Sequence, residues 1–457
     1  MAGTGPHLEK QLGLFNAVTI NMCNMVGSGL FVALPLMLGA MHGPQALIGW
    51  IVGAAIAIAD GLVWSELASA LPGSGGTYVY LREAFGRERW GRFAAFLFTF
   101  QMISSGPLEI ASGTIAVAQY LSYLWPGIAP VGGKAPIAGK LIAAGLAALA
   151  IILLYRKITS IARLMMWLWI GVLLAVGWII VSGMANFRPG LAFSFPPGAF
   201  SFSLGFIAGL GSATGLAMYC YLGYYGVCYL GDEVVNPPRT IPPAVIISVL
   251  AVLAIDFLFC LAILGVLPWQ QAQGSPYIAC DFMGELYGRW AGVVICLLMV
   301  WTSFAGVYAL MLTYSRIPYA AALDGNFFRV FGRLHPTKDF PHFSLLLVGG
   351  VSVAASFFDL AEVIAALLTV RIVVQFLGQV VALHSLRRYR PEVHRPFRMA
   401  LYPVPAIVAF LGWLYVFVNA GTKAIAFGAI TLFAGCAIFL AVSWKAGAWP
   451  FPRPALE

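Results

Sequence analysis

The most informative part of the chain is Asn24-Met25-Val26-Gly27-Ser28-Gly29-Leu30-Phe31, which sets two glycines around a serine in the middle of the apolar segment 12–38. A second stretch, Tyr219-Cys220-Tyr221-Leu222-Gly223-Tyr224-Tyr225-Gly226, interrupts the apolar segment 203–232 in a similar way. Glycines in a membrane segment either let helices pack closely or accompany unwound backbone that lines a cavity. Because both stretches carry the pattern, we expect a helix break in each segment.

The composition excludes whole classes of function. Of the 457 residues, 61% are hydrophobic and only 9% are charged, whereas a typical soluble domain carries about 25% charged residues. Such a chain cannot build a water-facing surface. The composition therefore excludes a soluble enzyme, a nucleic-acid-binding protein and a disordered protein, and it predicts an all-α integral membrane protein.

Apolar segments long enough to cross a membrane recur along the chain. A helix needs roughly 20 apolar residues to cross a bilayer core, and twelve segments meet this requirement. The first is too long for a cleaved leader, so we expect it to be retained. The twelve expected spans are residues 12–38, 43–71, 92–125, 137–155, 161–185, 203–232, 242–267, 289–318, 343–358, 361–386, 401–420 and 424–446.

The distribution of basic residues predicts the orientation. With the N-terminus inside, 20 of the 26 Lys and Arg residues fall on the cytoplasmic side, 5 fall on the opposite side, and Arg371 lies within a span. This bias follows the positive-inside rule. We therefore expect both termini to be cytoplasmic, in a plasma membrane or a bacterial inner membrane.

The positions of the two expected breaks predict an internal repeat. The breaks fall in the first and sixth spans, so the two units that they begin have opposite orientations, as in a five-plus-five inverted repeat. A break frees N–H groups at the positive end of one half-helix and carbonyl groups at the end of the other. Such a site can hold a carboxylate and an ammonium together, which suits a zwitterionic amino acid.

This repeat also predicts the limits of the domains. The last two spans lie outside the repeat and are expected to serve packing or dimer contact, in a monomer or a homodimer. The expected parts are a cytoplasmic N-terminus at 1–11, a ten-helix transport core at 12–390 with repeats at about 12–190 and about 200–390, two accessory helices at 400–446, and a cytoplasmic tail at 447–457.

Four motifs in order carry a family resemblance. They are Gly27–Phe31, Glu66–Gly86 with its Pro72-Gly73-Ser74-Gly75-Gly76 core, Asp232–Pro242, and Ser315-Arg316 followed by Ala320–Gly325. Over roughly the first 390 residues, the chain resembles permeases of the amino acid, polyamine and organocation (APC) superfamily. It is most similar to the L-type amino acid transporters and related bacterial branches. The resemblance implies a LeuT-type fold and amino acid transport by alternating access, as a permease or an exchanger.

The resemblance also implies a binding site at the two breaks. The substrate carboxylate should meet the N–H groups of Ser28 and Gly29, and the amine should meet carbonyl groups of Met25, Tyr219 and Leu222. Tyr219 stands where the family often places an aromatic gate. The full set of expected substrate-binding residues is Met25, Gly27, Ser28, Gly29, Tyr219, Cys220, Tyr221, Leu222 and Gly223.

Departures from the family pattern leave the coupling mode open. Residues 170–173 lack the lysine of many sodium-independent members, and the zone around Ala305 offers no hydroxyl closer than Thr302 or Ser303. The coupling ion is therefore a proton, sodium or, for an exchanger, none. The loop 126–136 has no cysteine, so we expect no disulfide-linked heavy chain. Neither a cofactor nor a metal is implied.

Ionisable residues within spans are expensive and often functional. For Asp60 and Asp256, which occupy equivalent helices of the repeat, we expect structural polar contacts. Glu109 and Arg371 lie near the middle of the third and tenth spans. They either neutralise each other as a pair, or Glu109 carries a coupling proton, or Glu109 selects the second amine of a polyamine or a cationic amino acid.

Charged residues at the cytoplasmic face are candidates for an inner gate. They are Glu66, Arg82, Asp232 and Glu233, whose opposite charges could close the gate and part during each cycle. The competing interpretation is that Asp232 and Glu233 are solvated interfacial acids and that Glu66 forms an ion pair or caps a loop.

Two rival functions differ in class. A membrane-embedded enzyme would need His, Cys or paired carboxylates gathered at one depth, and the sequence offers no such cluster, so we expect no enzyme. A non-transporting amino acid sensor or a channel on the same fold stays open, because binding residues do not reveal turnover.

Overall fold

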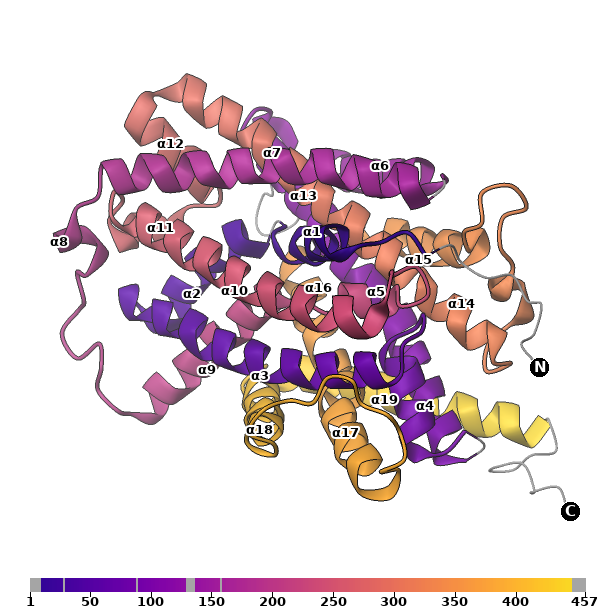
Figure 1. Ribbon diagram of the computed structural model, residues 1–457. Helices are drawn as coiled ribbons and strands as arrows, with labels where there is room; N and C mark the ends of the chain where they lie inside the picture. The colour runs from indigo at the N-terminus through magenta and orange to yellow at the C-terminus, as the bar shows by residue number, and fades with distance from the viewer. Residues whose placement is uncertain (1–9, 28, 88, 129–135, 157, 446–457) are drawn as a thin grey trace, which may run out of the picture.

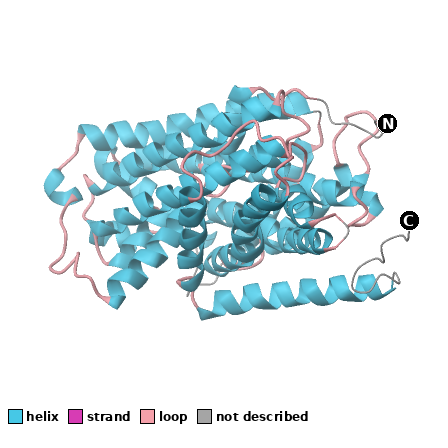
Figure 2. Cartoon of the chain, turned by 60° about the horizontal axis from the view of Figure 1, so that its bottom comes forward, coloured by secondary structure: helices cyan, strands magenta, loops and turns pink. Residues whose placement is uncertain are grey.

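The computed structural model describes residues 10–27, 29–87, 89–128, 136–156 and 158–445. Within these ranges the chain forms helices joined by loops and contains no strand (Figure 2). Extended contacts occur there as two isolated bridges, between Leu12 and Val234 and between Ser74 and Leu230. The expectation of an all-helical chain is confirmed for the described residues.

The helices of the first part of the chain lead up to the second glycine-rich stretch. They are α1 (Leu14–Met25), α2 (Gly29–Met41), η1 (Pro44–Leu47), α3 (Ile48–Ala70), α4 (Thr77–Phe85), α5 (Trp90–Leu121), η2 (Pro126–Ile128), α6 (Ile137–Leu154), α7 (Ile158–Ala185), α8 (Pro189–Ala192) and α9 (Leu204–Tyr221).

The remaining helices come after that stretch. They are η3 (Gly226–Tyr229), α10 (Pro237–Leu264), α11 (Trp269–Gly274), α12 (Ile278–Tyr287), α13 (Arg289–Tyr314), α14 (Arg316–Leu323), η4 (Arg329–Gly332), α15 (His342–Ala355), α16 (Leu360–Arg371), the π-helical η5 (Ile372–Leu377), α17 (Gly378–Tyr389), α18 (Val404–Val418) and α19 (Thr422–Lys445).

Many of these helices are long and apolar. Nine helices of the described residues could cross a membrane by length and composition, and α1 with α2 makes a tenth if the bent pair is one span. The apolar helices α15 and α18 have 14 and 15 residues, and they lie where the ninth and eleventh spans were expected. The described residues therefore contain nine candidate spans, or ten if the bent pair counts as one span, while the total of twelve stays a prediction.

The long helices pack against one another in pairs. α3 packs along α10, as Figure 1 shows, and α5 packs along α13. Of the last two helices, α18 lies against α3, and α19 lies against α16 and α5. Large apolar side chains such as Ile152, Trp167 and Phe433 remain exposed on the outside, which fits a surface that contacts lipid.

The first expected break is present. α1 ends at Met25, α2 begins at Gly29, and the two helix axes differ by 43°. Between them the backbone leaves helical geometry at Val26, with φ −84° and ψ 82°. Ser28 lies outside the described residues.

The second break is present but differs from the expected span. α9 stops at Tyr221, and Gly223 adopts φ +111°, a conformation that glycine tolerates and other residues rarely adopt. The chain then makes one 3₁₀ turn, η3, and α-helix resumes only at Pro237. The expected break is therefore present, but the expectation that the span continues to residue 232 is wrong, because residues 222–232 form turns and one 3₁₀ turn.

Candidate functional site

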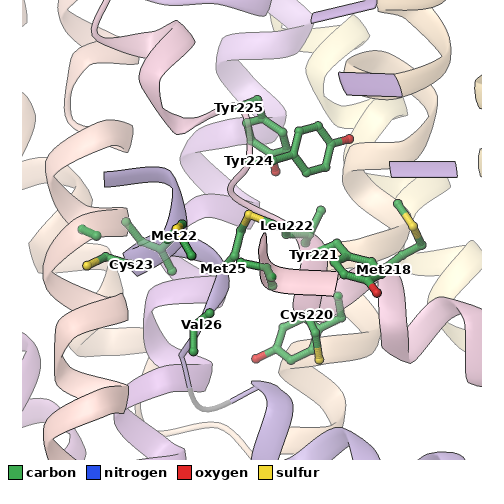
Figure 3. Packing of buried hydrophobic residues seen from close by; sticks show 14 of the residues in the cluster. Met22, Cys23, Met25, Val26, Met218, Cys220, Tyr221, Leu222, Tyr224 and Tyr225 are labelled. Atoms are coloured by element: carbon green, nitrogen blue, oxygen red, sulfur yellow. The ribbon is translucent and has the colours of Figure 1, made fainter. Parts of the chain in front are cut away.

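The two breaks lie against each other in the middle of the bundle. The side chain of Asn21 on α1 accepts a hydrogen bond from the N–H of Val227 at 2.8 Å. Gly223 approaches α1 so closely that a Cβ atom there would lie 2.5 Å from the Cβ of Asn24. Figure 3 shows Met25, at the end of α1, close to Leu222, which follows the end of α9. Gly223 therefore turns the chain after α9 and also lets this turn approach the end of α1 closely.

A small cavity opens beside this contact. Its volume is about 30 Å³, which is room for one or two water molecules. Of the expected binding residues, five line it directly, and Glu109 joins them from α5. The complete lining is Asn24, Met25, Gly27, Gly29, Glu109, Ser112, Gly113, Tyr219, Cys220, Ser303, Gly306, Val307 and Leu310.

The remaining expected residues do not line this cavity. Tyr221 instead donates to the carbonyl of Trp50 at 3.3 Å, and the two rings meet edge to face. Leu222 and Gly223 form the turn after α9 and are absent from the lining. Ser28 lies outside the described residues, so its expected contact with a carboxylate stays a prediction.

Much of the cavity wall was missed by sequence reasoning. α13 contributes Ser303 and Gly306, and Gly306 lies beside Gly27, as a Cβ on Gly306 would be 3.3 Å from the Cα of Gly27. On α5, Ser112 shares a hydrogen bond of 2.8 Å with the hydroxyl of Tyr219. Ser112 comes three residues after Glu109, a spacing that places both on one helix face. That spacing could have identified it.

Three polar atoms of the lining lack partners. Both side-chain amide atoms of Asn24 and the hydroxyl of Ser303 are buried, and they have no hydrogen-bond partner among the described residues. A buried polar group without a partner costs about 1–3 kcal/mol. The cavity is therefore suited to a polar occupant.

The main chain at the breaks offers further hydrogen-bonding capacity. The first N–H groups of α2 have no partner within their own helix, as at every helix start. The carbonyl of Met25 accepts from Gly27 at 3.0 Å, and the carbonyl of Tyr219 accepts from Leu222 at 3.3 Å. Because a carbonyl oxygen has two lone pairs, each can accept one further bond. These groups can therefore hold a carboxylate and an ammonium.

Glu109 and Arg371 form a buried ion pair beside the cavity. Tyr314 donates to the same Glu109 oxygen at 2.5 Å, and Arg371 donates to Ser105 at 3.0 Å through Nε. The Arg371 side chain is fully buried and also contacts the hydroxyls of Tyr314 and Tyr225 at 3.0 and 3.5 Å. This network joins α5, α13 and α16 to the second break.

The chain matches a known family along almost its whole length. A model of the amino acid permease family matches residues 12–443. The chain belongs to the amino acid permease family. This family comprises transporters and not enzymes, and it lies within the APC superfamily, so the expected resemblance is confirmed. The permease is accordingly a multi-pass membrane protein.

Relatives of the permease span most of its length. The aspartate-proton symporter of Bacillus subtilis is 25% identical over 431 residues, which cover 92% of this chain and 81% of the relative. Human Asc-type amino acid transporter 1 is 25% identical over 474 residues, with 96% and 82% covered. Human cationic amino acid transporter 4 is 27% identical over 390 residues, with 81% and 57% covered.

Ion pairs of the permease gather at the end of the bundle that holds Arg82, Arg316 and Arg387, here called the basic end. Glu66 binds Arg387 through two hydrogen bonds of 2.7 and 2.5 Å, and one of its oxygens also accepts from the N–H of Met399 at 2.8 Å. Glu66 thus combines an ion pair with a loop contact. Its partner is Arg387 and not Arg82.

The other gate candidates also have separate partners. Glu233 pairs with Arg316 at 2.8 Å, and their side chains are 1% and 2% exposed. Arg82 pairs with Glu83 at 2.8 Å and with Asp324. Asp232 accepts a hydrogen bond of 2.9 Å from the N–H of Ser74. The two acids after the second break are therefore engaged by the protein rather than left to solvent alone.

The carboxyl groups of Asp60 and Asp256 differ sharply. Asp60 accepts hydrogen bonds from Trp64 at 3.0 Å and from Tyr224, so the expected polar contacts are present. Asp256 is 1% exposed, and neither of its oxygens has a hydrogen-bond partner among the described residues. For Asp256 the expectation of polar contacts is wrong, because no described group forms a hydrogen bond with either carboxyl oxygen.

Proposed function

We propose that the permease is a secondary active amino acid transporter that works by alternating access. One observation carries this proposal: the first break, after Met25, and the last turn of α9, just before the second break, line a single cavity. The start of α2 supplies N–H groups for the carboxylate, and the carbonyls of Met25 and Tyr219 supply acceptors for the amine. Two relatives are named as an aspartate-proton symporter and an Asc-type amino acid transporter, which supports an amino acid as the ligand.

The size of the cavity is consistent with a moving site. Only about 30 Å³ of the cavity is open to the centre of a water-sized sphere, so a substrate with a bulky side chain requires the lining to move apart. Tyr219 is held by Ser112 through a hydrogen bond of 2.8 Å, and releasing this bond enlarges the site. Asn24 and Ser303 then offer polar atoms that have no partner among the described residues.

The contacts that Glu109 already makes indicate which class of substrate the site accepts. Arg371 and Tyr314 already contact the carboxylate, so a second substrate amine would have to displace an arginine. We therefore favour a zwitterionic amino acid over a polyamine or a cationic amino acid, although human cationic amino acid transporter 4 is among the relatives.

Counterflow tests the proposal against its rivals. The purified protein is screened for thermal stabilisation by the twenty amino acids and common polyamines, since a ligand of the folded state raises apparent stability. Proteoliposomes loaded with the stabilising compound should then accumulate the same labelled compound from outside. Binding without exchange would indicate a sensor, and flux without trans-stimulation would indicate a channel.

The ion pairs at the basic end support an inner gate. Glu233 comes after the second break and Arg316 begins α14, while Glu66 lies near the end of α3 and Arg387 lies on α17. These pairs join different elements, so a route to that end opens only when they part. Exchanging the charges of Glu233 and Arg316 should restore more transport than either single charge reversal retains.

The repeat and the orientation remain part of the proposal. Residues 12–390 form the transport core, with both termini cytoplasmic and α18 and α19 as accessory helices. The packing of α3 on α10 and of α5 on α13 joins the second span to the seventh and the third to the eighth, which supports equivalent halves. Labelling of single cysteines from each side of the membrane tests the orientation.

A further inference from the structure

Asp256 is a carboxylic acid buried without a partner. It lies on α10, 1% exposed, and both oxygens lack a hydrogen-bond partner among the described residues. Burying a carboxylate ion in such surroundings costs a large free energy of desolvation. Burying the neutral acid costs much less, because it loses only its hydrogen bonds to water. In this arrangement of the helices, Asp256 therefore holds a proton.

Within the described part of the chain, the surroundings of Asp256 contain no cation that would stabilise its charge. The titratable groups that face it are Cys220 and Tyr221 of α9 and Cys260 one turn further along α10. The elements with the most contacts to α10 are α1, α3, α7, α8, α11, η1 and η3, and α2, which carries no titratable group, meets α10 through the rings of Phe31 and Phe259. Their other titratable groups are Cys23 on α1, Asp60 and Glu66 on α3, Cys228 and Tyr229 on η3, and Arg163 on α7.

Arg163 is too far along α7 to reach this carboxyl. Gly183 of α7 meets Ala262 of α10, and Arg163 precedes Gly183 by 20 positions while Asp256 precedes Ala262 by 6. At 1.5 Å per residue, the two side chains are about 20 Å apart along the helices. Asp60 is held by Trp64 and Tyr224, and Glu66 by Arg387.

Asp256 lies within range of an electrostatic interaction with Cys220, a residue of the cavity wall. Its near neighbour Cys220 lines the cavity, and the Cys220 sulfur would lie 3.2 Å from a Cβ on Gly29, the first residue of α2. A movement that parts α9 from α2 to admit substrate also admits water to this carboxyl. Hydration stabilises the carboxylate, so the proton leaves when the wall opens and binds when it closes.

We propose that Asp256 is a proton-binding site that couples proton movement to transport, an inference that rests on the proposed transport function. The carboxylate takes a proton from water on one side of the membrane and releases it to water on the other side. Glu109, which Arg371 neutralises, is not the carrier.

Proteoliposomes with a trapped pH-sensitive dye such as pyranine test this coupling. A mixture of the twenty amino acids is added outside, and internal acidification is followed together with uptake of the labelled mixture. Wild-type protein should acidify the interior, and uptake should fall by up to about tenfold per pH unit above its midpoint, as one bound proton requires. Asp256→Asn should abolish acidification and make uptake independent of pH.

Matched variants sharpen the result. Asp60→Asn changes the equivalent carboxyl on α3, which has partners, and should keep both acidification and the pH profile. Asp256→Glu restores a carboxyl and should keep a pH dependence with a shifted midpoint, which provides a readout if Asp256→Asn does not fold. Acidification by Asp256→Asn at the wild-type rate, or an unshifted midpoint in Asp256→Glu, would overturn the proposal. Absence of labelled uptake by wild-type protein would instead contradict the transport function.

Discussion

Glu109 on α5 and Arg371 at the end of α16 neutralise each other inside the bundle, and Glu109 also forms part of the cavity wall. Of the three interpretations that the sequence left open, this geometry corresponds to the ion pair. Both side chains are almost completely buried, at 5% and 0% exposed. Such a pair holds its helices together only while both charges are present, because either charge alone is left uncompensated in a low-dielectric interior.

Removal of one partner should therefore cost more than removal of both. Glu109→Gln or Arg371→Met alone leaves a buried charge and should destabilise the fold by about 3–5 kcal/mol. The double variant removes both charges and should be more stable than either single variant. Thermal unfolding in detergent measures all four proteins as a double-mutant cycle. A double variant whose loss equals the sum of the two single losses would contradict the pairing.

A methyl group at Gly29 should narrow the cavity. The added Cβ would lie 3.2 Å from both the Cys220 sulfur and a ring carbon of Tyr219. The added methyl group competes with the substrate for room, and an overpacking cost of about 1.4 kcal/mol that arises only in the bound state, within the usual range of about 1–3 kcal/mol, corresponds to tenfold in affinity. Gly29→Ala should therefore weaken substrate binding by about tenfold. Gly145→Ala on α6, where the Cβ meets nothing within 4 Å, is the control. Unchanged half-saturation of counterflow in Gly29→Ala would contradict the assigned site.

A methyl group at Gly223 should destabilise the whole fold. The residue has φ +111°, and its Cβ would lie 2.5 Å from the Cβ and 3.0 Å from the carbonyl carbon of Asn24. Backbone strain and overpacking together predict a loss of about 2–4 kcal/mol. The measurement is the fraction of protein that elutes as a single folded species. Gly177→Ala on α7, which meets open space, should behave as wild type, and equal behaviour of both variants would refute the close contact.

The carboxyl group of Glu83 should make stability depend on acid pH. Burial tends to raise the pKa of Glu83, but hydrogen bonds from Arg87 and Arg82 outweigh it and hold the pKa below the ordinary value of 4.5. The unfolded chain therefore binds this proton more readily than the folded chain. The stability that the ionised Glu83 carboxylate adds to the folded state is complete above pH 4.5, and it is lost as the pH falls through the lower pKa that Glu83 has in the folded state.

Melting temperatures measured from about pH 6 downwards check this sign. Wild-type protein should lose stability below pH 4.5 more steeply than Glu83→Gln, whereas both should respond alike above that value. Glu285→Gln, which changes an exposed carboxylate on α12, should follow the wild-type curve. Parallel curves for wild type and Glu83→Gln throughout would show that the arginines do not stabilise the carboxylate.

The parts of the fold that the sequence predicted depend on local pattern. Apolar length alone predicted α3, which was expected as the second span at 43–71 and is observed at Ile48–Ala70. The glycine pairs indicated both breaks. The path of the chain after the second break was not predictable in this way. Residues 222–232 are apolar enough to continue a helix, but the positive φ of Gly223 and the contact with Asn24 turn the chain instead.

Contacts between residues far apart in the chain were the part of the structure that the sequence predicted least well. Glu66 was expected to form an ion pair or to cap a loop without a named partner, and it binds Arg387, 321 positions away. The cavity wall from α13, with Ser303 and Gly306, likewise depends on how α13 packs against α1. Hydropathy is a property of each segment by itself, whereas these contacts arise only from the assembled bundle. Asp256 illustrates the same limit, since its lack of partners among the described residues cannot be read from its own helix.

The short backbone bridge between Leu12 and Val234 has a mechanical consequence. The N–H groups of Gln11 and Leu12 both donate to the carbonyl of Glu233 at 2.9 Å, and Val235 donates back to Leu12 at 2.9 Å. The Asn21 side chain ties the far end of α1 to Val227. Because hydrogen bonds join the chain to residues 227–235 near both ends of α1, a movement of α1 should also move residues 227–235. We therefore expect the segments around the two helix breaks to move together rather than one after the other.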